Sequence, residues 1–168
     1  MIPKQMLLIS AFTTALSLSA YAADEPTVHV QQPRLQGPRE LQEATAKAVV
    51  QNYLDSWQSM SKALNQNRPD LLDRDFVGSA KEKLAATIKQ QAAAGVNATY
   101  HDRSHDVQIL FYSPEGLSIQ LADDVEYDVQ LSSGGKSLGT QQVKTRYVVV
   151  LTPSEVRWRV RIFQAEAQ

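Results

Sequence analysis

The sequence contains no cysteine, and this absence excludes several kinds of chemistry at once. Disulfide bonds, thiolate metal sites and a cysteine nucleophile all require a thiol. The chain also lacks an excess of either charge, with 17 basic and 18 acidic residues among 168. Because a neutral chain has no general attraction for phosphate backbones, we expect no nucleic-acid partner.

Motifs of common enzyme chemistry are missing as well. The Gly-x-Ser-x-Gly elbow, the Walker loop, the dinucleotide-binding glycine pattern and the His-Glu-x-x-His zinc motif do not occur in the chain. We therefore expect no cofactor and no metal site. What is present, 43% hydrophobic and 21% charged residues, is typical of one globular domain.

Residues 1–22 have the pattern of a secretory signal peptide. Lys4 supplies a positive start, residues 6–18 are apolar apart from Ser and Thr, and Ala20-Tyr21-Ala22 offers small residues at the cleavage positions. The alternative is an uncleaved membrane anchor, but the run is shorter than the ~20 residues that span a bilayer. We expect cleavage after Ala22, a mature chain with no integral membrane segment, and a periplasmic or secreted location.

The remaining chain divides into a short leader and one domain. Residues 23–37 contain Pro26 and Pro33 and show no apolar period, so we expect a flexible leader. Residues 38–168 show no internal repeat and are predicted to form a single domain. An exported domain without disulfides favours the bacterial cell envelope.

The first half of the domain has helical periodicity. Apolar side chains recur at three- and four-residue steps over residues 38–64, which predicts a long amphipathic helix beginning at Pro38. A short second helix is predicted over residues 69–76. A third follows over residues 79–92, where Ser79 and Glu82 form a capping-box pattern and Gly95 suits the end of the helix.

After Gly95 the apolar side chains alternate, which is typical of strands. We predict strands over residues 107–112, 117–131, 143–151 and 156–162, with an extra short strand around residues 97–103. The second strand is long, so we expect a bend or bulge near Asp123 and Asp124. The predicted class is α+β: three N-terminal helices followed by a bent, cone-shaped, four-stranded antiparallel sheet.

Turn geometry predicts how these strands pair. A loop of residues 134–136 places Glu126 opposite Lys144 and Asp124 opposite Arg146, and it keeps the apolar side chains on one face. A four-residue turn then brings the last strand into the same register. Its side chains expected on the inner face are Val156, Trp158, Val160 and Ile162.

This order of elements resembles the nuclear transport factor 2-like (SnoaL-like, cystatin-like cone) superfamily over residues 38–163. The segments that carry the resemblance are Ala48-Val49-Val50-Gln51-Asn52-Tyr53-Leu54, Tyr147-Val148-Val149-Val150 and Val156-Arg157-Trp158-Arg159-Val160. Tyr53 is similar in place to the oxyanion-hole tyrosine of the family's ketosteroid isomerases. Their catalytic aspartate lies in a hairpin that residues 76–78 replace, so the isomerase mechanism lacks its proton acceptor. The chain looks more like the non-catalytic, envelope-associated members.

Aromatic side chains on the predicted inner faces allow two interpretations. They pack as plain core, or they line a pocket for a small hydrophobic ligand. The candidate pocket residues are Tyr53, Trp57, Tyr127 and His101. His101 and His105 lie about 13 Å apart in an extended chain, too far to share a metal ion, and we interpret this stretch mainly as solvated.

Charged side chains form two stripes on the predicted outer face of the sheet. The acidic stripe is Asp124, Glu126 and Asp128; the basic one is Lys144, Arg146, Arg157, Arg159 and Arg161, with Val148 and Val150 beside it. The face is either a solvated surface with cross-strand ion pairs or a protein interface.

From these observations we predict an exported, non-catalytic binding or assembly module of the bacterial cell envelope. It acts through the polar sheet face on an envelope protein or on a second copy of itself. The alternative is a carrier of a small hydrophobic ligand, or a SnoaL-like enzyme, that uses the aromatic interior.

Overall fold

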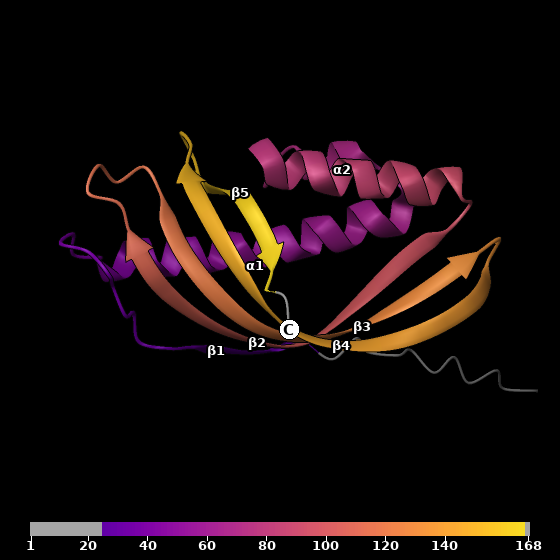
Figure 1. Ribbon diagram of the computed structural model, residues 1–168, viewed down its shortest axis with the longest axis horizontal. Helices are drawn as coiled ribbons and strands as arrows, with labels where there is room; N and C mark the ends of the chain where they lie inside the picture. The colour runs from indigo at the N-terminus through magenta and orange to yellow at the C-terminus, as the bar shows by residue number, and fades with distance from the viewer. Residues whose placement is uncertain (1–24, 167–168) are drawn as a thin grey trace, which may run out of the picture.

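A computed structural model describes residues 25–166, so the predicted signal peptide lies outside the described residues. The elements are β1 (Thr27–Val30), α1 (Glu43–Gln66), η1 (Pro69–Leu72), α2 (Gly78–Ala93), β2 (Asn97–Tyr112), β3 (Ile119–Ser133), β4 (Lys136–Pro153) and β5 (Trp158–Ala165). The strands form one mixed sheet in the order β1-β2-β3-β4-β5. The sheet curves around α1, with α2 beyond it (Figure 1). The α+β class is confirmed, with a sheet that is not closed.

Helix α1 forms because its apolar residues repeat at helical spacing and face the inside of the curved sheet. Val49, Tyr53 and Trp57 are almost completely buried along this stripe, as the periodicity predicts. The helix begins at Glu43, five residues after Pro38, and is followed by Asn67 in the left-handed conformation with a φ of 53°. Asparagine tolerates that conformation better than most residues.

Residues 25–166 form two α-helices rather than the predicted three. The second predicted helix is only the 3₁₀ turn η1, after which Phe76 forms a bridge to Val160 of β5. The Val160 amide donates to the Asp75 carbonyl, and the Val77 amide donates to the Val160 carbonyl. These long-range bonds draw the chain away from a helix, and a local apolar pattern does not reveal them.

The sheet formed by the described residues has five strands rather than four. The additional strand, β1, lies within the predicted leader and pairs in parallel with residues 104–107 of β2. The following chain stays bonded to β2, because the Gln31 amide donates to the Val107 carbonyl and the Arg34 amide to the Ile109 carbonyl. Val28 and Val30 alternate with Thr27 and His29, but all four residues are exposed, so this short alternation does not mark a buried face.

The bend of the sheet arises in β2. This strand absorbs the predicted short strand at residues 97–103, and its pairing with β3 shifts between Asp102 and Ser104 and again between Ile109 and Phe111. Such irregularities bend a strand and increase its twist. The bulge predicted at Asp123 and Asp124 is wrong, because β3 pairs without a break there.

The predicted register of β3 and β4 is confirmed. Glu126 lies opposite Lys144, and Asp124 lies opposite Arg146. The hairpin turn is one residue shorter than predicted, since Ser133 already pairs with Lys136, and a shift in the pairing next to Leu131 restores the register. Gly134 and Gly135 both have positive φ, as a two-residue hairpin turn requires.

The predicted register of β4 and β5 is wrong. Leu151 pairs with Val160 rather than with Val156, and a shift in the pairing then brings Phe163, rather than Trp158, opposite the buried Val149. Ile162 therefore turns to the outer face. The cause is a four-residue turn that lies at residues 154–157 rather than 152–155, combined with a bulge, and alternation alone cannot locate either of them.

Candidate functional site

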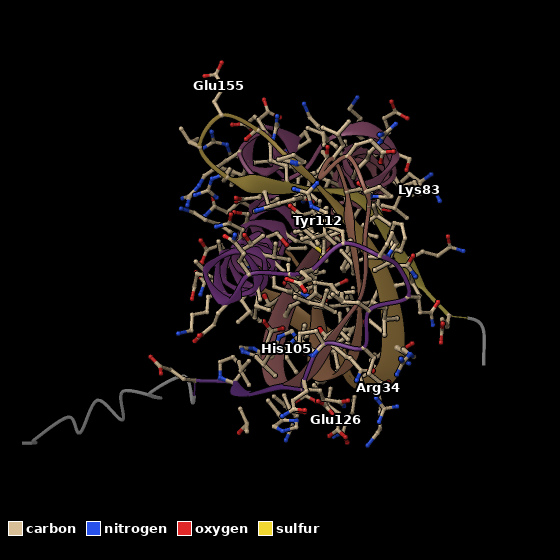
Figure 2. The ribbon with its side chains drawn as sticks, turned by 90° about the vertical axis from the view of Figure 1, so that its left-hand side faces the viewer. Arg34, Lys83, His105, Tyr112, Glu126 and Glu155 are labelled. Carbon is tan, nitrogen blue, oxygen red and sulfur yellow. The ribbon has the colours of Figure 1, made fainter. Side chains whose placement is uncertain are left out.

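The inside of the curved sheet contains a buried polar cluster centred on Asp123 of β3. The Tyr53 hydroxyl donates to Asp123 Oδ2 at 2.7 Å, and His105 Nδ1 lies 2.7 Å from the same oxygen. The backbone amide of Asp106 donates to Asp123 Oδ1 at 3.1 Å. Tyr53 and Asp123 are 0% exposed and His105 is 2% exposed. In Figure 2 His105 lies above Glu126, and Glu126 marks the outer face of the sheet.

Two carboxylates set the charge of this cluster. His105 Nε2 lies 3.8 Å from Asp102 Oδ2, while its Nδ1 lies against Asp123. Burial by itself lowers the pKa of His105, but Asp102 and Asp123 outweigh it and raise that pKa to about 9. Burial, together with the Asp123 charge, raises the pKa of the Tyr53 hydroxyl. At neutral pH His105 is therefore a cation held between carboxylates.

Trp57 of α1 fills the space next to this cluster. Its ring lies 5.2 Å from His105, 5.5 Å from Tyr127, 5.6 Å from Tyr147 and 5.5 Å from Phe163, measured between ring centroids. Trp57 is 1% exposed, and its Nε1 is buried without a hydrogen-bond partner among the described residues. Aromatic packing of this kind stabilises a core. Here the aromatic rings fill the interior next to the polar cluster.

The polar cluster around Asp123 contains a histidine, a carboxylate and a tyrosine, which are residue types of acid–base chemistry, but it is closed to solvent. Three of the four predicted pocket residues, Tyr53, Trp57 and Tyr127, meet in the interior. His101 does not join them, because it is exposed and lies opposite Asp128. A substrate reaches His105 or Asp123 only if the packing around Trp57 opens.

His105 and Asp123 are the interior residues that the sequence reasoning missed. The interpretation of residues 101–106 as a solvated stretch is wrong for His105, which is buried. A signal was available, since His105 continues the inward alternation of Val107 and Asp123 continues that of Val125. Polar residues in an apolar row are informative because burying them requires partners.

The three arginines of the last predicted strand lie at a seam between β5 and the chain after η1. Arg157 forms an ion pair with the buried carboxylate of Asp75, which also accepts a hydrogen bond from the Ser59 hydroxyl. Arg159 donates to the backbone carbonyls of Asp73 and Phe76. The Arg161 carbonyl accepts a hydrogen bond from Ser79. The structure thus separates these arginines from Lys144 and Arg146, and Ser79 does not cap α2.

The outer face of the sheet keeps the two predicted stripes, and they pair with each other. Lys144 Nζ lies 2.5 Å from Glu126 Oε1, and Arg146 lies 2.6 Å from Asp124 Oδ2. Asp128 pairs with Arg103 of β2. Exposed pairs of this kind contribute about 0–1 kcal/mol each, so they neutralise the face more than they stabilise the fold.

Beside these ion pairs lies an apolar strip formed by Val148 and Val150 of β4 and Ile162 of β5. Val150 pairs with Ile162, so their side chains share the outer face, and Ile162 is 39% exposed. A hollow of about 520 Å³ adjoins the strip and is lined by Val148, Gln164, Ala165 and Glu166. The predicted valines therefore lie half-buried on the outer face, next to an isoleucine that the sequence reasoning placed on the inner face.

Two further hollows lie outside the interior cluster. One of about 780 Å³ runs between the first half of α1 and β1, where Val50 and Leu54 face Val28 and Val30. The other, of about 540 Å³, lies along α2. Within residues 25–166 no group of three or more His, Asp or Glu is placed to hold a metal ion. No helix in this part of the chain is long and apolar enough to cross a membrane.

Comparisons with known proteins find structures of similar fold but no protein of similar sequence. No family model and no curated protein matches the sequence. The intermembrane space region of the chloroplast protein ARC6 superposes with a TM-score of 0.63 at 16% identity, over 78% of this chain and 100% of that one. Kfla4162 from Kribbella flavida superposes with a TM-score of 0.51 at 11% identity, over 73% and 92%. A scytalone dehydratase-like protein from Novosphingobium aromaticivorans reaches only 0.47 at 11% identity, over 74% and 85%.

At these identities the likenesses concern the fold alone. They show that a curved sheet around a long helix is an arrangement that these proteins share with this chain. Fold by itself does not establish function.

Proposed function

We propose that this protein is an exported, non-catalytic binding module of the bacterial cell envelope that acts through the outer face of its sheet. The observation that carries the proposal is the apolar strip of Val148, Val150 and Ile162, in which the valines are half-buried and Ile162 is exposed, beside a row of internally paired charges. Apolar residues surrounded by satisfied polar groups are typical of the centre and rim of a protein interface.

The closed interior supports the same proposal. Trp57 and Tyr53 occupy the space where a ligand would have to lie, and both are almost completely buried. A binding pocket for a small molecule is normally a preformed cleft. The outer face, in contrast, is accessible without any rearrangement.

The charges next to the strip limit the net charge that a partner can have. Glu126 with Lys144, and Asp124 with Arg146, cancel each other across β3 and β4. A partner therefore needs an apolar centre and no large net charge. An envelope protein or a second copy of this chain satisfies this requirement.

The test places a charge in the strip. Val148→Glu is expected to abolish partner capture from periplasmic extract, or self-association in sedimentation, because it buries a carboxylate in the interface. Val156→Glu is the matched control, since Val156 is 88% exposed in the turn before β5 and lies outside the strip. Equal capture and equal association by wild type and both variants would contradict the proposal.

A second candidate function uses the interior as a small-molecule site. It is favoured by the Tyr53, His105 and Asp123 network and by the unpaired Nε1 of Trp57. Trp158→Phe leaves Trp57 as the single tryptophan, whose emission then reports access to the interior. We expect acrylamide to quench it weakly, because the ring is buried; strong quenching would favour the second candidate.

A further inference from the structure

A groove of about 780 Å³ runs along one edge of the sheet, between β1 and the first half of α1. Val28 and Val30 of β1 form one wall and are 40% and 50% exposed. The other wall is α1, where residues 43–54 span about 16 Å, the length of about five residues of an extended chain. The apolar side chains that line the groove are Val28, Val30, Pro33, Val50, Leu54 and Ile109. The groove therefore has the length and the lining of a site for a short apolar segment.

The wall formed by β1 carries backbone groups that are free to bond. β1 is an edge strand, which pairs in parallel with β2 and, among the described residues, with no other strand. The Gln31 amide donates to the Val107 carbonyl, and alternate residues of a strand direct their backbone groups to the same side, so those of His29 also face β2. Val28 and Val30 direct their amides and carbonyls away from β2, where no described residue pairs with them. Unpaired edge groups of this kind are a template for another strand.

The charged groups around the groove are already paired with one another. Lys47 Nζ lies 2.7 Å from Glu43 Oε1. On the β1 side, Asp106 accepts a hydrogen bond from Gln31 Nε2 at 2.9 Å, and its other oxygen lies 2.8 Å from His29 Nδ1. These two contacts also attach β1 to β2, so the edge is formed before a ligand binds. The groove thus favours a segment without charged side chains.

The two walls together favour a peptide over other apolar ligands. A lipid chain would cover the edge groups of Val28 and Val30 without offering them hydrogen bonds, and burying an unpaired amide or carbonyl is costly. An extended peptide supplies these bonds and still places alternate side chains in the groove. A second folded copy is disfavoured, because a stable interface buries about 800 Å² per partner and an edge of four residues is only about 13 Å long.

We propose that the groove between β1 and α1 binds an extended, uncharged peptide segment of another protein, which adds to the edge of β1 as a further strand. Its backbone pairs with Val28 and Val30. Its side chains alternate, so that every second one contacts Val50 and Leu54 of α1 and the others face away from the groove. The site is separate from the apolar strip on β4 and β5, because β1 and β5 lie at opposite ends of the strand order.

The test uses a synthetic peptide of about seven residues, a typical length for a strand, in which Val and Thr alternate. Two controls have the same sequence, with the amides N-methylated at all Val residues in one and at all Thr residues in the other. N-methylation removes a donor, and the two sets of amides face opposite sides of a strand. We expect the parent peptide to bind and exactly one of the controls to bind about tenfold more weakly, because it loses its bonds to β1.

Three outcomes of the peptide test would overturn the proposal. The first is that no peptide binds, and the second is that all three bind with equal affinity, since backbone pairing then plays no part. The third is that a neutral monoacylglycerol binds in the groove and the parent peptide cannot displace it, which would make the site a lipid site.

Two variants locate the binding on the two walls of the groove. Val30→Glu places a carboxylate in the apolar groove and is expected to weaken binding of the parent peptide at least tenfold. Thr27→Glu is the matched control on the same strand, because Thr27 does not line the groove, and it should leave the affinity unchanged. Leu54→Ala removes apolar contact from α1 and should weaken binding about fivefold, which keeps the test valid if Val30→Glu detaches β1. Equal affinities of the wild type, Val30→Glu and Leu54→Ala would contradict the proposed site.

The same assay separates this proposal from the proposed function. Val148→Glu should leave binding of the Val-Thr peptide unchanged, because the outer strip lies on other strands. Val30→Glu should equally leave partner capture through the strip unchanged. Each proposal can therefore fail while the other stands.

Hydrogen exchange gives a direct readout of strand addition. In the free protein the amides of Val28 and Val30 should exchange faster than those of His29 and Gln31, which face β2. The bound Val-Thr peptide should slow exchange of the first pair. Unchanged exchange at saturating peptide would overturn the proposal. So would a concentration-dependent dimer of the free protein that Val30→Glu abolishes, because the edge would then bind a second copy.

Discussion

The buried imidazole of His105 connects the electrostatics of the interior to the stability of the protein. Its ring is held by Asp123 and Asp102 and packs against Trp57, which comes from the central helix. A charge inside the fold is tolerated only when its partners replace water. His105 therefore joins β2, β3 and α1 through one side chain.

This arrangement predicts how stability changes with pH. The pKa of His105 is 6.5 as a free group and about 9 in the fold, so the folded state holds the proton more tightly. Its stabilising contribution is complete below pH 6.5 and is lost as the pH rises through 9. Urea unfolding of the wild type should show a falling free energy of unfolding across this window.

The control for this prediction is His105→Gln, which removes the titrating group. The variant should be less stable at neutral pH, and its stability should change less with pH between 6.5 and 9 than that of the wild type. A wild-type free energy of unfolding that stays constant or rises over this range would contradict the assignment.

At the scale of elements, the seam around Asp75 attaches the chain after η1 to β5. The carboxylate of Asp75 is 1% exposed and is shared by Ser59 of α1 and Arg157 next to β5. Asp75 thus fixes three elements relative to one another. The contact therefore holds the chain in place where the predicted second helix does not form.

We expect Asp75→Ala to lower the free energy of unfolding by about 3–5 kcal/mol, because it leaves Arg157 without its partner in a mostly buried place. Chemical denaturation measures this change. The matched control is Glu126→Ala, which removes one partner of an exposed pair with Lys144 and should cost about 1 kcal/mol or less. Similar costs for the two variants would show that the seam contributes no more than the surface.

The same seam shows why pairing could be predicted in one part of the sheet and not in another. Between β3 and β4 a short glycine turn leaves few registers that keep Val125 and Thr145 on the inner face, so sequence reasoning found the correct one. Between β4 and β5 the bulge at Arg161 reverses the alternation, and Arg159 turns to carbonyls of a distant segment. Local periodicity contains no information about such a partner.

For the whole molecule, the N-terminal sequence makes a prediction about export. If the protein is produced in a bacterium, we expect the mature chain to begin at Ala23, because Ala20 and Ala22 suit the cleavage positions of a signal peptidase. N-terminal sequencing of the periplasmic fraction measures this. Ala22→Arg should accumulate as the longer precursor, and recovery of uncleaved wild type in the cytoplasm would contradict the prediction.

The sequence by itself determined those features that depend on local spacing: an α+β class, a long central helix with its stripe of Tyr53 and Trp57, and the pairing of Glu126 with Lys144. These follow from periods of 3.6 and 2 and from short turns. Only the tertiary structure decided that Asp123 gathers Tyr53 and His105, that Arg157 and Arg159 bind the chain after η1, and that residues 27–30 pair with β2. The reason is that partners far apart in the chain set each of these features, and no repeat in the sequence encodes such distances.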